Sequence, residues 1–325
     1  MKPQNLTTKI FLDSGDPDET RKALDLLGFL DGQTTNPSLV AKKILSTNVI
    51  PAKAGISEIP DRVGDDVLRN LKLTEDQLLQ EYKSIVEEIS SLIPKGSVSI
   101  EVYSDENTTA DQMLRQGKEM FSWIPNAHIK FPTTQEGLRA ASNAVSEKIR
   151  VNMTLVFQQQ QAAAVYSATL RRASLAQGKP FDSTQVKPDS TLPGFKNVFV
   201  SPFIGRLDDR GENGMDLIKS ITRMYSNGDG HVMNLSASIR NLDHFIGSVA
   251  NGADIITCPY AILEEWVKRG MHVPDSSYIY DSKNLQPIAY QELDLHKPWN
   301  EFDISHELTD VGLKRFADDW NKLLG

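Results

Sequence analysis

A lysine in the middle of an apolar run is the first residue of this sequence that could do chemistry. Lys130 lies in the stretch NAHIKFPTT, residues 126–134, and Ile129 and Phe131 flank it in the pattern of a short buried strand. Burial disfavours the ammonium form, so part of this side chain is expected as the free amine near neutral pH. A free amine adds to carbonyl carbons, and lysines in such places form Schiff bases. The alternative is a lysine whose stem packs in the strand while its head reaches solvent or a carboxylate.

The residues after the lysine predict that its strand leads directly into a helix. Thr133 and Glu136 have the spacing of a capping box, and apolar residues at helical spacing follow them. The same order recurs along the chain, and nearly every predicted strand is followed by a helical pattern. We expect eight strands, at residues 9–12, 32–36, 97–103, 127–131, 150–157, 197–206, 231–238 and 254–258.

Strict alternation of strand and helix implies a parallel sheet, and eight units is the number that closes a barrel. We therefore predict an α/β protein with a (β/α)8 TIM barrel. An open doubly wound sheet is the alternative, but no GxGxxG follows the first strand and no GxxxxGK[ST] occurs in the chain. A nucleotide-binding version of that fold is thus not favoured.

Three segments interrupt or extend the predicted barrel, which we otherwise expect to form a single domain over residues 1–325. Residues 46–73 and 173–196 are interpreted as insertions with little regular structure, the second on the amino-terminal face of the barrel. Residues 272–325 form an extension, and residues 305–324 within it are predicted as an amphipathic helix that packs on the barrel. The glutamine run at 158–161 is interpreted as an exposed helix surface.

Composition excludes several functional classes. The chain of 325 residues has 35 basic and 43 acidic side chains, a balance that argues against nucleic acid and anionic membranes as partners. Its one cysteine, Cys258, allows no internal disulfide, and we see neither a membrane-spanning apolar run nor a secretory leader. No His or Cys cluster has the spacing of metal ligands, so no metal is expected. We expect a soluble cytoplasmic protein.

Polar side chains at the carboxyl ends of barrel strands meet at one mouth. One amine, two carboxylates, several neutral hydrogen-bonding groups and two arginines stand at these positions. Together they suggest Schiff-base chemistry on a phosphorylated carbonyl compound. The residues are Asp13, Asn36, Glu101, Lys130, Asn152, Thr154, Ser201, Arg206, Ser238 and Arg240.

Individual members of this set also have structural explanations. Asn36, which precedes a proline and a helical pattern, could simply be an N-cap. Glu101 could form a buried salt bridge with Lys130. Ser201 could shape a turn, and Arg206 could pair with one of the aspartates at 208 and 209.

Seven motifs, in order, make the sequence resemble the transaldolase family. The final VGLKRFADDWNKL (311–323) is also similar to the last helix of the longer transaldolases. The motifs span most of the chain, and TTNPSL with the lysine strand is the most specific part. They are FLDSGD (11–16), TTNPSL (34–39), IEV (100–102), IKFPTTQEG (129–137), VNMTLVF (151–157), SPFIGR (201–206) and SASIRN (236–241).

The resemblance implies a role for each residue at the predicted mouth. Lys130 corresponds to the Schiff-base lysine, and Asp13 to the acid/base residue for the hydroxyl beside the broken bond. Glu101 and Thr154 correspond to the pair that positions a catalytic water. The residues that correspond to hydroxyl-binding positions are Asn36, Asn152 and Ser201, and those that correspond to phosphate-binding positions are Arg206, Ser238 and Arg240.

The implied activity is transfer of a dihydroxyacetone unit between sugar phosphates, without a cofactor, as in the pentose phosphate pathway. The family also leads us to expect a homodimer. A fructose-6-phosphate aldolase, which releases free dihydroxyacetone, is the close alternative, and Phe203 favours transfer because aldolase-type members usually carry tyrosine there. A non-catalytic sugar-phosphate-binding protein is the remote alternative, but it would be expected to have lost Lys130, Glu101 or Asp13.

Overall fold

Eight parallel strands close into a barrel in which each strand pairs with the next and β8 pairs with β1. The computed structural model describes residues 2–49, 73–170, 192–275 and 277–325. The predicted (β/α)8 barrel is thereby confirmed. The strands are β1 (Lys9–Asp13), β2 (Gly32–Thr34), β3 (Ser97–Glu101), β4 (Ala127–Pro132), β5 (Val151–Val156), β6 (Val198–Pro202), β7 (Val232–Ser236) and β8 (Ile255–Cys258).

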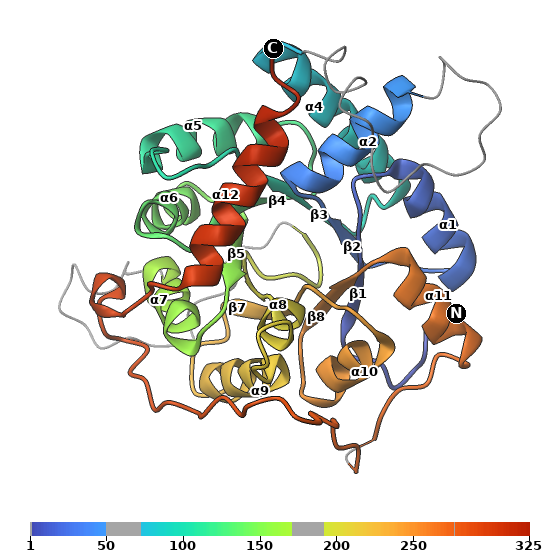
Figure 1. Cartoon of the computed structure of the whole chain (residues 1–325), viewed down its shortest axis with the longest axis vertical. Coiled ribbons are helices and arrows are strands. Elements are labelled where there is room, and N and C mark those ends of the chain that lie inside the picture. Colours follow the sequence, from blue (N-terminus) through green and yellow to red (C-terminus); the bar gives the residue numbers. More distant parts are fainter. Residues whose placement is uncertain (1, 50–72, 171–191, 276) are drawn as a thin grey trace.

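Helices form a ring around the strands, and α12 lies across one end of the barrel (Figure 1). The ring contains α1 (Pro17–Leu27), α2 (Pro37–Val49), α4 (Glu75–Leu92), α5 (Ala110–Phe121), α6 (Gln135–Ser146), α7 (Gln159–Thr169), α8 (Ile204–Asp208), α9 (Gly214–Tyr225), α10 (Leu242–Ala250) and α11 (Tyr260–Lys268). A long irregular segment then leads past α10 and α9 to the 3-10 turn η3 (Trp299–Glu301) and to α12 (Glu307–Asn321).

Alternation along β4 directs Lys130 into the barrel. Ile129 and Phe131 face the helix layer, because a Cβ added at Gly117 of α5 would lie 3.2 Å from Ile129 Cγ2 and 3.0 Å from Phe131 Cζ. Since successive side chains of a strand point to opposite faces, Lys130 and His128 face inward.

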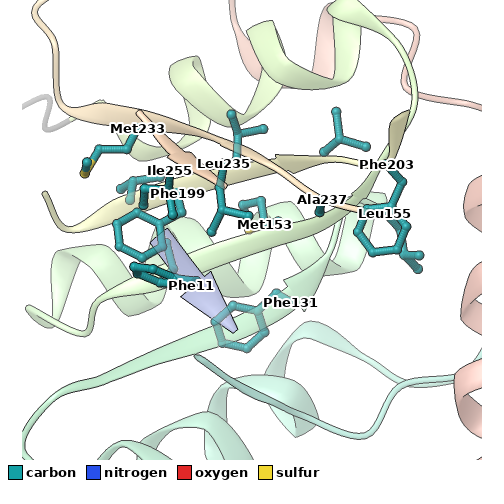
Figure 2. Close-up of a cluster of buried hydrophobic side chains, with 14 of the residues drawn as sticks. Phe11, Phe131, Met153, Leu155, Phe199, Phe203, Met233, Leu235, Ala237 and Ile255 are labelled. Atoms are coloured by element: carbon teal, nitrogen blue, oxygen red, sulfur yellow. The ribbon is translucent and has the colours of Figure 1, made fainter. Parts of the chain in front are cut away.

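The lower layer of the barrel interior is aromatic. His128 stacks on Phe199 with ring centroids 4.0 Å apart. Phe11 meets Phe199 edge-on at 6.3 Å, and both rings are seen in Figure 2. Burial lowers the pKa of His128 to about 3, so the ring is neutral. The same alternation brings Asp13, Lys130 and Ser201, two residues further along their strands, to the layer above. A packed floor therefore lies beneath the predicted chemical groups.

The start of α6 differs from the predicted capping box. Thr134, one residue later than predicted, caps α6 by accepting a hydrogen bond from Gly137 N. Thr133 instead donates to Thr154 O, and Glu136 accepts a hydrogen bond from Ala110 N at the start of α5. The predicted capping box was wrong because both of its side chains make tertiary contacts.

The glutamine run at the start of α7 is not a helix surface, as its composition suggested. Gln159 and Gln161 are buried. Gln159 exchanges two hydrogen bonds with the backbone of Gln291, of 2.7 and 2.8 Å. Gln161 donates to Ile304 O and to Thr309 Oγ1, at 3.2 and 2.8 Å. The prediction was wrong because these amides hold the extended tail and α12 against the barrel.

The structure describes only the ends of the two predicted insertions. Helix α2 continues to Val49, into the first of them, and the rest of that segment up to residue 72 lies outside the described residues. Of the second, residues 192–196 are described, and they run into the start of β6 with Leu192 and Phe195 buried.

Helix α12 comes very close to β5 at one glycine. Leu155 has a φ of +60°, in a strand whose register shifts between Met153 and Val156, and Thr309 Oγ1 donates to its carbonyl at 3.0 Å. A Cβ added at Gly312 would lie 2.5 Å from Leu155 Cδ2 and 2.8 Å from Arg206 Nη1. The absence of a side chain at Gly312 is therefore what lets the helix settle on the barrel.

Replacing Gly312 with alanine is expected to destabilise the protein. The added methyl group overpacks the contact at a cost of about 1–3 kcal/mol, whereas alanine favours the helix over glycine by about 1 kcal/mol. Denaturant unfolding should therefore show a free energy of unfolding that is lower by up to about 2 kcal/mol. Val311→Ala, at an exposed position of the same helix, should change stability by less than about 0.5 kcal/mol. A Gly312→Ala variant more stable than the parent would show that α12 does not pack this closely.

Candidate active site

A cavity of about 240 Å³ opens at the carboxyl ends of the strands. Of the eleven residues predicted for the site, Glu101 and Asn152 are the two that do not line it, because they lie behind Lys130 and Ser201. Lining residues that the sequence did not single out include Thr34, Thr257, Arg315 and Phe316. The predicted residues that line it are Asp13, Asn36, Lys130, Thr154, Ser201, Phe203, Arg206, Ser238 and Arg240.

Lys130 lies at the base of this cavity beside a carboxylate. Its Nζ is 2.8 Å from Glu101 Oε2, the neighbouring position in the strand register, and donates to Thr35 O at 3.0 Å. Both side chains are buried, with exposed fractions of 5% and 2%. The separation is that of an ion pair, but the angles are not those of a hydrogen bond, and Oε2 lacks a hydrogen-bond partner among the described residues. The buried salt bridge that we considered for Glu101 is thus present.

Burial raises the pKa of the Glu101 carboxyl, and the charge of Lys130 only partly opposes this effect. Because ionising the buried carboxyl is costly, the ion pair of carboxylate and ammonium lies closer in free energy to the neutral pair of carboxylic acid and amine. The pair can therefore pass a proton between the amine and a ligand.

Asp13 is the second carboxylate of the site. Its Oδ1 accepts a 2.7 Å hydrogen bond from Thr34 Oγ1, which in turn lies 2.7 Å from Thr257 Oγ1. Burial raises the pKa of Asp13, while Lys130 and the Thr34 hydroxyl act in the opposite direction. Thr34 and Thr257 come from the two strands that flank β1, and this pair fixes the position of the carboxylate.

Thr154 carries a buried hydroxyl at the cavity wall. Its Oγ1 has no hydrogen-bond partner among the residues that the structure describes. Buried polar atoms are nearly always paired in folded proteins, so an orphaned hydroxyl marks a position where a ligand or a water bonds. Glu101 Oε2 also lacks a hydrogen bond within the described residues, but it has Lys130 Nζ as an ion-pair partner at 2.8 Å.

A relay of hydrogen bonds holds Ser201. The hydroxyl of Ser201 donates to Asn152 Oδ1 at 2.6 Å, and Asn152 Nδ2 donates to Ser99 Oγ at 3.1 Å. Asn152 is fully buried, so its observed role is to hold the Ser201 side chain in place from behind. Asn36 accepts a hydrogen bond from Leu39 N through its side-chain oxygen, and it is therefore an N-cap as well as part of the cavity wall.

The far end of the cavity is basic. The Arg206 guanidinium lies between two rings, 5.1 Å from the centroid of Phe203 and 5.6 Å from that of Phe316. Burial, and then the charges of Arg315 and Arg240, lower the pKa of Arg206 to about 10, so it stays protonated at neutral pH. Convergent guanidinium groups at one end of a cavity are suited to a phosphate group.

The loop that carries Ser238 and Arg240 packs directly on α8. A Cβ at Gly205 would lie 2.1 Å from Ser238 O, so only glycine allows this approach. Arg240 Nη2 is 2.9 Å from Asp209 Oδ2. Asp208 binds His244 Nε2 at 2.9 Å. The pairing of Arg206 with an aspartate that we considered does not form, because both aspartates have other partners.

The described parts of the chain contain no group of three or more His, Cys, Asp or Glu side chains arranged to hold a metal ion. None of the described helices is both long and apolar enough to cross a membrane.

Comparison with known proteins gives one consistent result. A family model described as Transaldolase/Fructose-6-phosphate aldolase matches residues 10–325. A probable transaldolase of Dehalococcoides mccartyi is 30% identical over 315 residues, which cover 97% of this chain and 99% of that protein. A probable transaldolase of Clostridium perfringens is 31% identical over 314 residues, which cover 97% and 98%.

Among solved structures, a crystal structure of KGPDC from Streptococcus mutans matches 81% of this chain and 98% of its own, at 13% identity and a TM-score of 0.38. That likeness is too low to bear on function, whereas the sequence matches span nearly the whole chain. The chain therefore belongs to the transaldolase/fructose-6-phosphate aldolase family.

Proposed function

We propose that this protein is a transaldolase of the pentose phosphate pathway that uses Lys130 as a Schiff-base nucleophile. The donor is a ketose phosphate, sedoheptulose 7-phosphate or fructose 6-phosphate, and the acceptor is glyceraldehyde 3-phosphate or erythrose 4-phosphate. The observation that carries the proposal is the placement of Lys130 between two carboxyl groups at the base of a cavity whose far end holds Arg206 and Arg240.

The first step is addition of the amine to the ketone carbon of the donor. Lys130 Nζ transfers a proton to Glu101, the free amine then forms a bond to carbon 2, and one of the two protons left on nitrogen moves to the former carbonyl oxygen to give a hydroxyl. The same proton, returned by Glu101, allows the carbon 2 hydroxyl to leave as water and the iminium to form. Thr154 Oγ1, which has no partner within the described residues, is available to hydrogen-bond that hydroxyl or the departing water.

The second step breaks the bond between carbons 3 and 4. Asp13 takes the proton of the carbon 4 hydroxyl, an aldehyde forms at carbon 4, and the bonding electrons move onto the iminium to give an enamine. The raised pKa of Asp13 makes its carboxylate a stronger base than an exposed aspartate. When the enamine adds to an acceptor aldehyde, the cleavage runs in reverse. A new carbon-carbon bond forms, and Asp13 gives its proton to the oxygen of the former aldehyde.

The wall of the cavity at Phe203 supports transfer over release. Phe203 packs edge-on against Phe157, with ring centroids 5.8 Å apart, and brings no hydroxyl to the cavity. An apolar ring offers no group to hold or activate a water that would protonate the enamine. Phe203 therefore favours reaction of the enamine with an acceptor aldehyde over its protonation by water.

The proposal is tested by trapping the intermediate. The protein is mixed with fructose 6-phosphate, reduced with borohydride and analysed by intact and peptide mass spectrometry. We expect a dihydroxyacetone-sized adduct on Lys130. If erythrose 4-phosphate is added before the borohydride, it should react with the enamine and yield sedoheptulose 7-phosphate. The dihydroxyacetone-sized adduct should then no longer be trapped.

Two outcomes would overturn the proposal in different ways. Rapid release of free dihydroxyacetone without an acceptor would make the protein a fructose-6-phosphate aldolase. A folded protein that binds sugar phosphate but gives no adduct on any lysine would be a binding protein.

A further inference from the structure

Helix α12 packs one face on the barrel beside the cavity. Thr309, Gly312 and Phe316 recur at intervals of three and four residues, so they lie on the same side of the helix. All three contact the barrel, Thr309 through Leu155 O, Gly312 through Leu155 and Arg206, and Phe316 through the Arg206 guanidinium. Arg315 is three residues after Gly312 and lines the cavity with Phe316.

The helix is fixed at both of its ends. At the first turn, His306 stacks on Phe157 with ring centroids 5.3 Å apart. Beyond the last turn, Leu73 and Leu324 form a bridge of strand type, and Leu73 N donates to Leu323 O at 2.9 Å. Contacts at both ends therefore hold α12 in the position where Arg315 and Phe316 line the cavity.

Arg315 is not held by a strong ion pair of its own. Its Nε is 3.9 Å from Asp319 Oδ2, at the limit of an ionic contact. Asp319 is already bound by Lys322, at 2.8 Å, and by the Ser38 hydroxyl. Arg315 is 65% exposed at the cavity rim, so its five donor N–H groups can turn toward an anion.

Arg206, Arg240 and Arg315 line the same cavity, and the charges of the other two act on Arg206. Among charged groups, Arg315 lowers the pKa of Arg206 more than Arg240 does. Three cations that repel one another at one end of a cavity are relieved when an anion binds among them. Asp209 pairs with Arg240 at 2.9 Å, so Arg206 and Arg315 are the two arginines best placed to bind the ligand.

We propose that Arg315 is a third phosphate-binding arginine, supplied by α12, and that it selects substrates that carry a phosphate monoester dianion. The inference rests on the proposed function, since it assigns the cavity to a sugar phosphate. Arg206 holds the phosphate from inside the cavity, between its two aromatic rings. Arg315 closes over it from the rim.

Binding of inorganic phosphate to the full chain, measured by isothermal titration calorimetry, tests this inference independently of turnover. Arg315→Leu should weaken phosphate binding about five- to twentyfold, as expected for one partly exposed charge-assisted contact. Lys314→Leu removes the same charge from the adjacent, 77% exposed position and should change the affinity less than about twofold. Arg315→Lys should recover part of the affinity, because it restores the charge without the guanidinium geometry.

Steady-state kinetics give a second measurement. Arg315→Leu should raise KM for fructose 6-phosphate with little change in kcat, and should lower the preference for fructose 6-phosphate over fructose. Equal phosphate affinities of the parent and Arg315→Leu, or equal losses in Arg315→Leu and Lys314→Leu, would overturn the inference. Either result together with a trapped adduct on Lys130 would leave the proposed function intact, whereas a missing adduct would remove that function.

Discussion

Replacement of Lys130 by methionine is expected to abolish both the borohydride adduct and turnover. Methionine keeps most of the stem volume, so the cavity retains its shape while the nucleophile is lost. Removal of a covalent nucleophile costs on the order of 10⁴-fold or more in kcat. Initial rates with fructose 6-phosphate and erythrose 4-phosphate measure the loss, and Lys148→Met, at an exposed position just beyond α6, is the control expected to keep full activity. Residual turnover above about 1% of the parent rate would show that another group attacks the carbonyl.

The same variant should be less stable at high pH than at low pH. Without Lys130, the Glu101 carboxyl stays buried, with an exposed fraction of 2%, but loses the cation that stabilises its ionised form. Its pKa should therefore rise still further above the usual range. A folded pKa above the unfolded value of about 4.3 means full stability below that value and a loss that grows as the pH rises through the folded pKa. Removing one partner of a buried ion pair costs about 3–5 kcal/mol, and protonation of Glu101 reduces that cost at low pH.

Thermal unfolding at pH 5 and pH 8 measures this effect. Lys130→Met should lose more of its Tm at pH 8, and the double variant Lys130→Met/Glu101→Gln should regain most of it while it stays inactive. A Tm loss that is equal at both values of pH would show that Glu101 is not the source of the instability.

The sequence predicts the barrel and the composition of its mouth because both depend on local patterns. Apolar runs of strand length alternate with capped helices, and parallel strands in register bring their carboxyl ends to one level. Asp13, Glu101 and Lys130 could be singled out because charged groups are unexpected in buried strands. In the structure, Glu101 and Lys130 are neighbours in the register, and Asp13 is paired with Thr34 of the next strand.

Side chains whose role depends on distant segments could not be found in this way. Thr34 and Thr257 look like ordinary strand threonines, and their contact joins positions 223 residues apart. Gln161 looks like a helix-surface residue until the tail, 143 to 148 residues later, supplies its hydrogen-bond partners. Arg315 has the exposure of a surface residue, and only the docking of α12 over the mouth gives it a place in the cavity.

Replacement of Asp13 by asparagine is expected to separate Schiff-base formation from carbon-carbon cleavage. Asparagine keeps an oxygen that can accept the Thr34 hydrogen bond, so the local geometry is preserved while the base is lost. Lys130 and Glu101 remain, and the iminium should still form. Loss of a general base lowers the cleavage rate by about 10²–10⁴-fold. Borohydride should therefore trap the whole hexose phosphate on Lys130, where the parent protein traps a dihydroxyacetone-sized fragment.

The pH dependence of kcat separates a base from a merely structural carboxylate. Because burial raises the pKa of Asp13, the parent should lose activity as the pH falls through a value above that of an exposed aspartate, about 3.9. The residual activity of Asp13→Asn should lack this acidic limb. Asp16→Asn is the matched control, because Asp16 caps α1 through its side chain and asparagine caps equally well. If Asp13→Asn yields the dihydroxyacetone-sized adduct at the parent rate, the proton of the carbon 4 hydroxyl goes elsewhere, and Glu101 becomes the base for both steps.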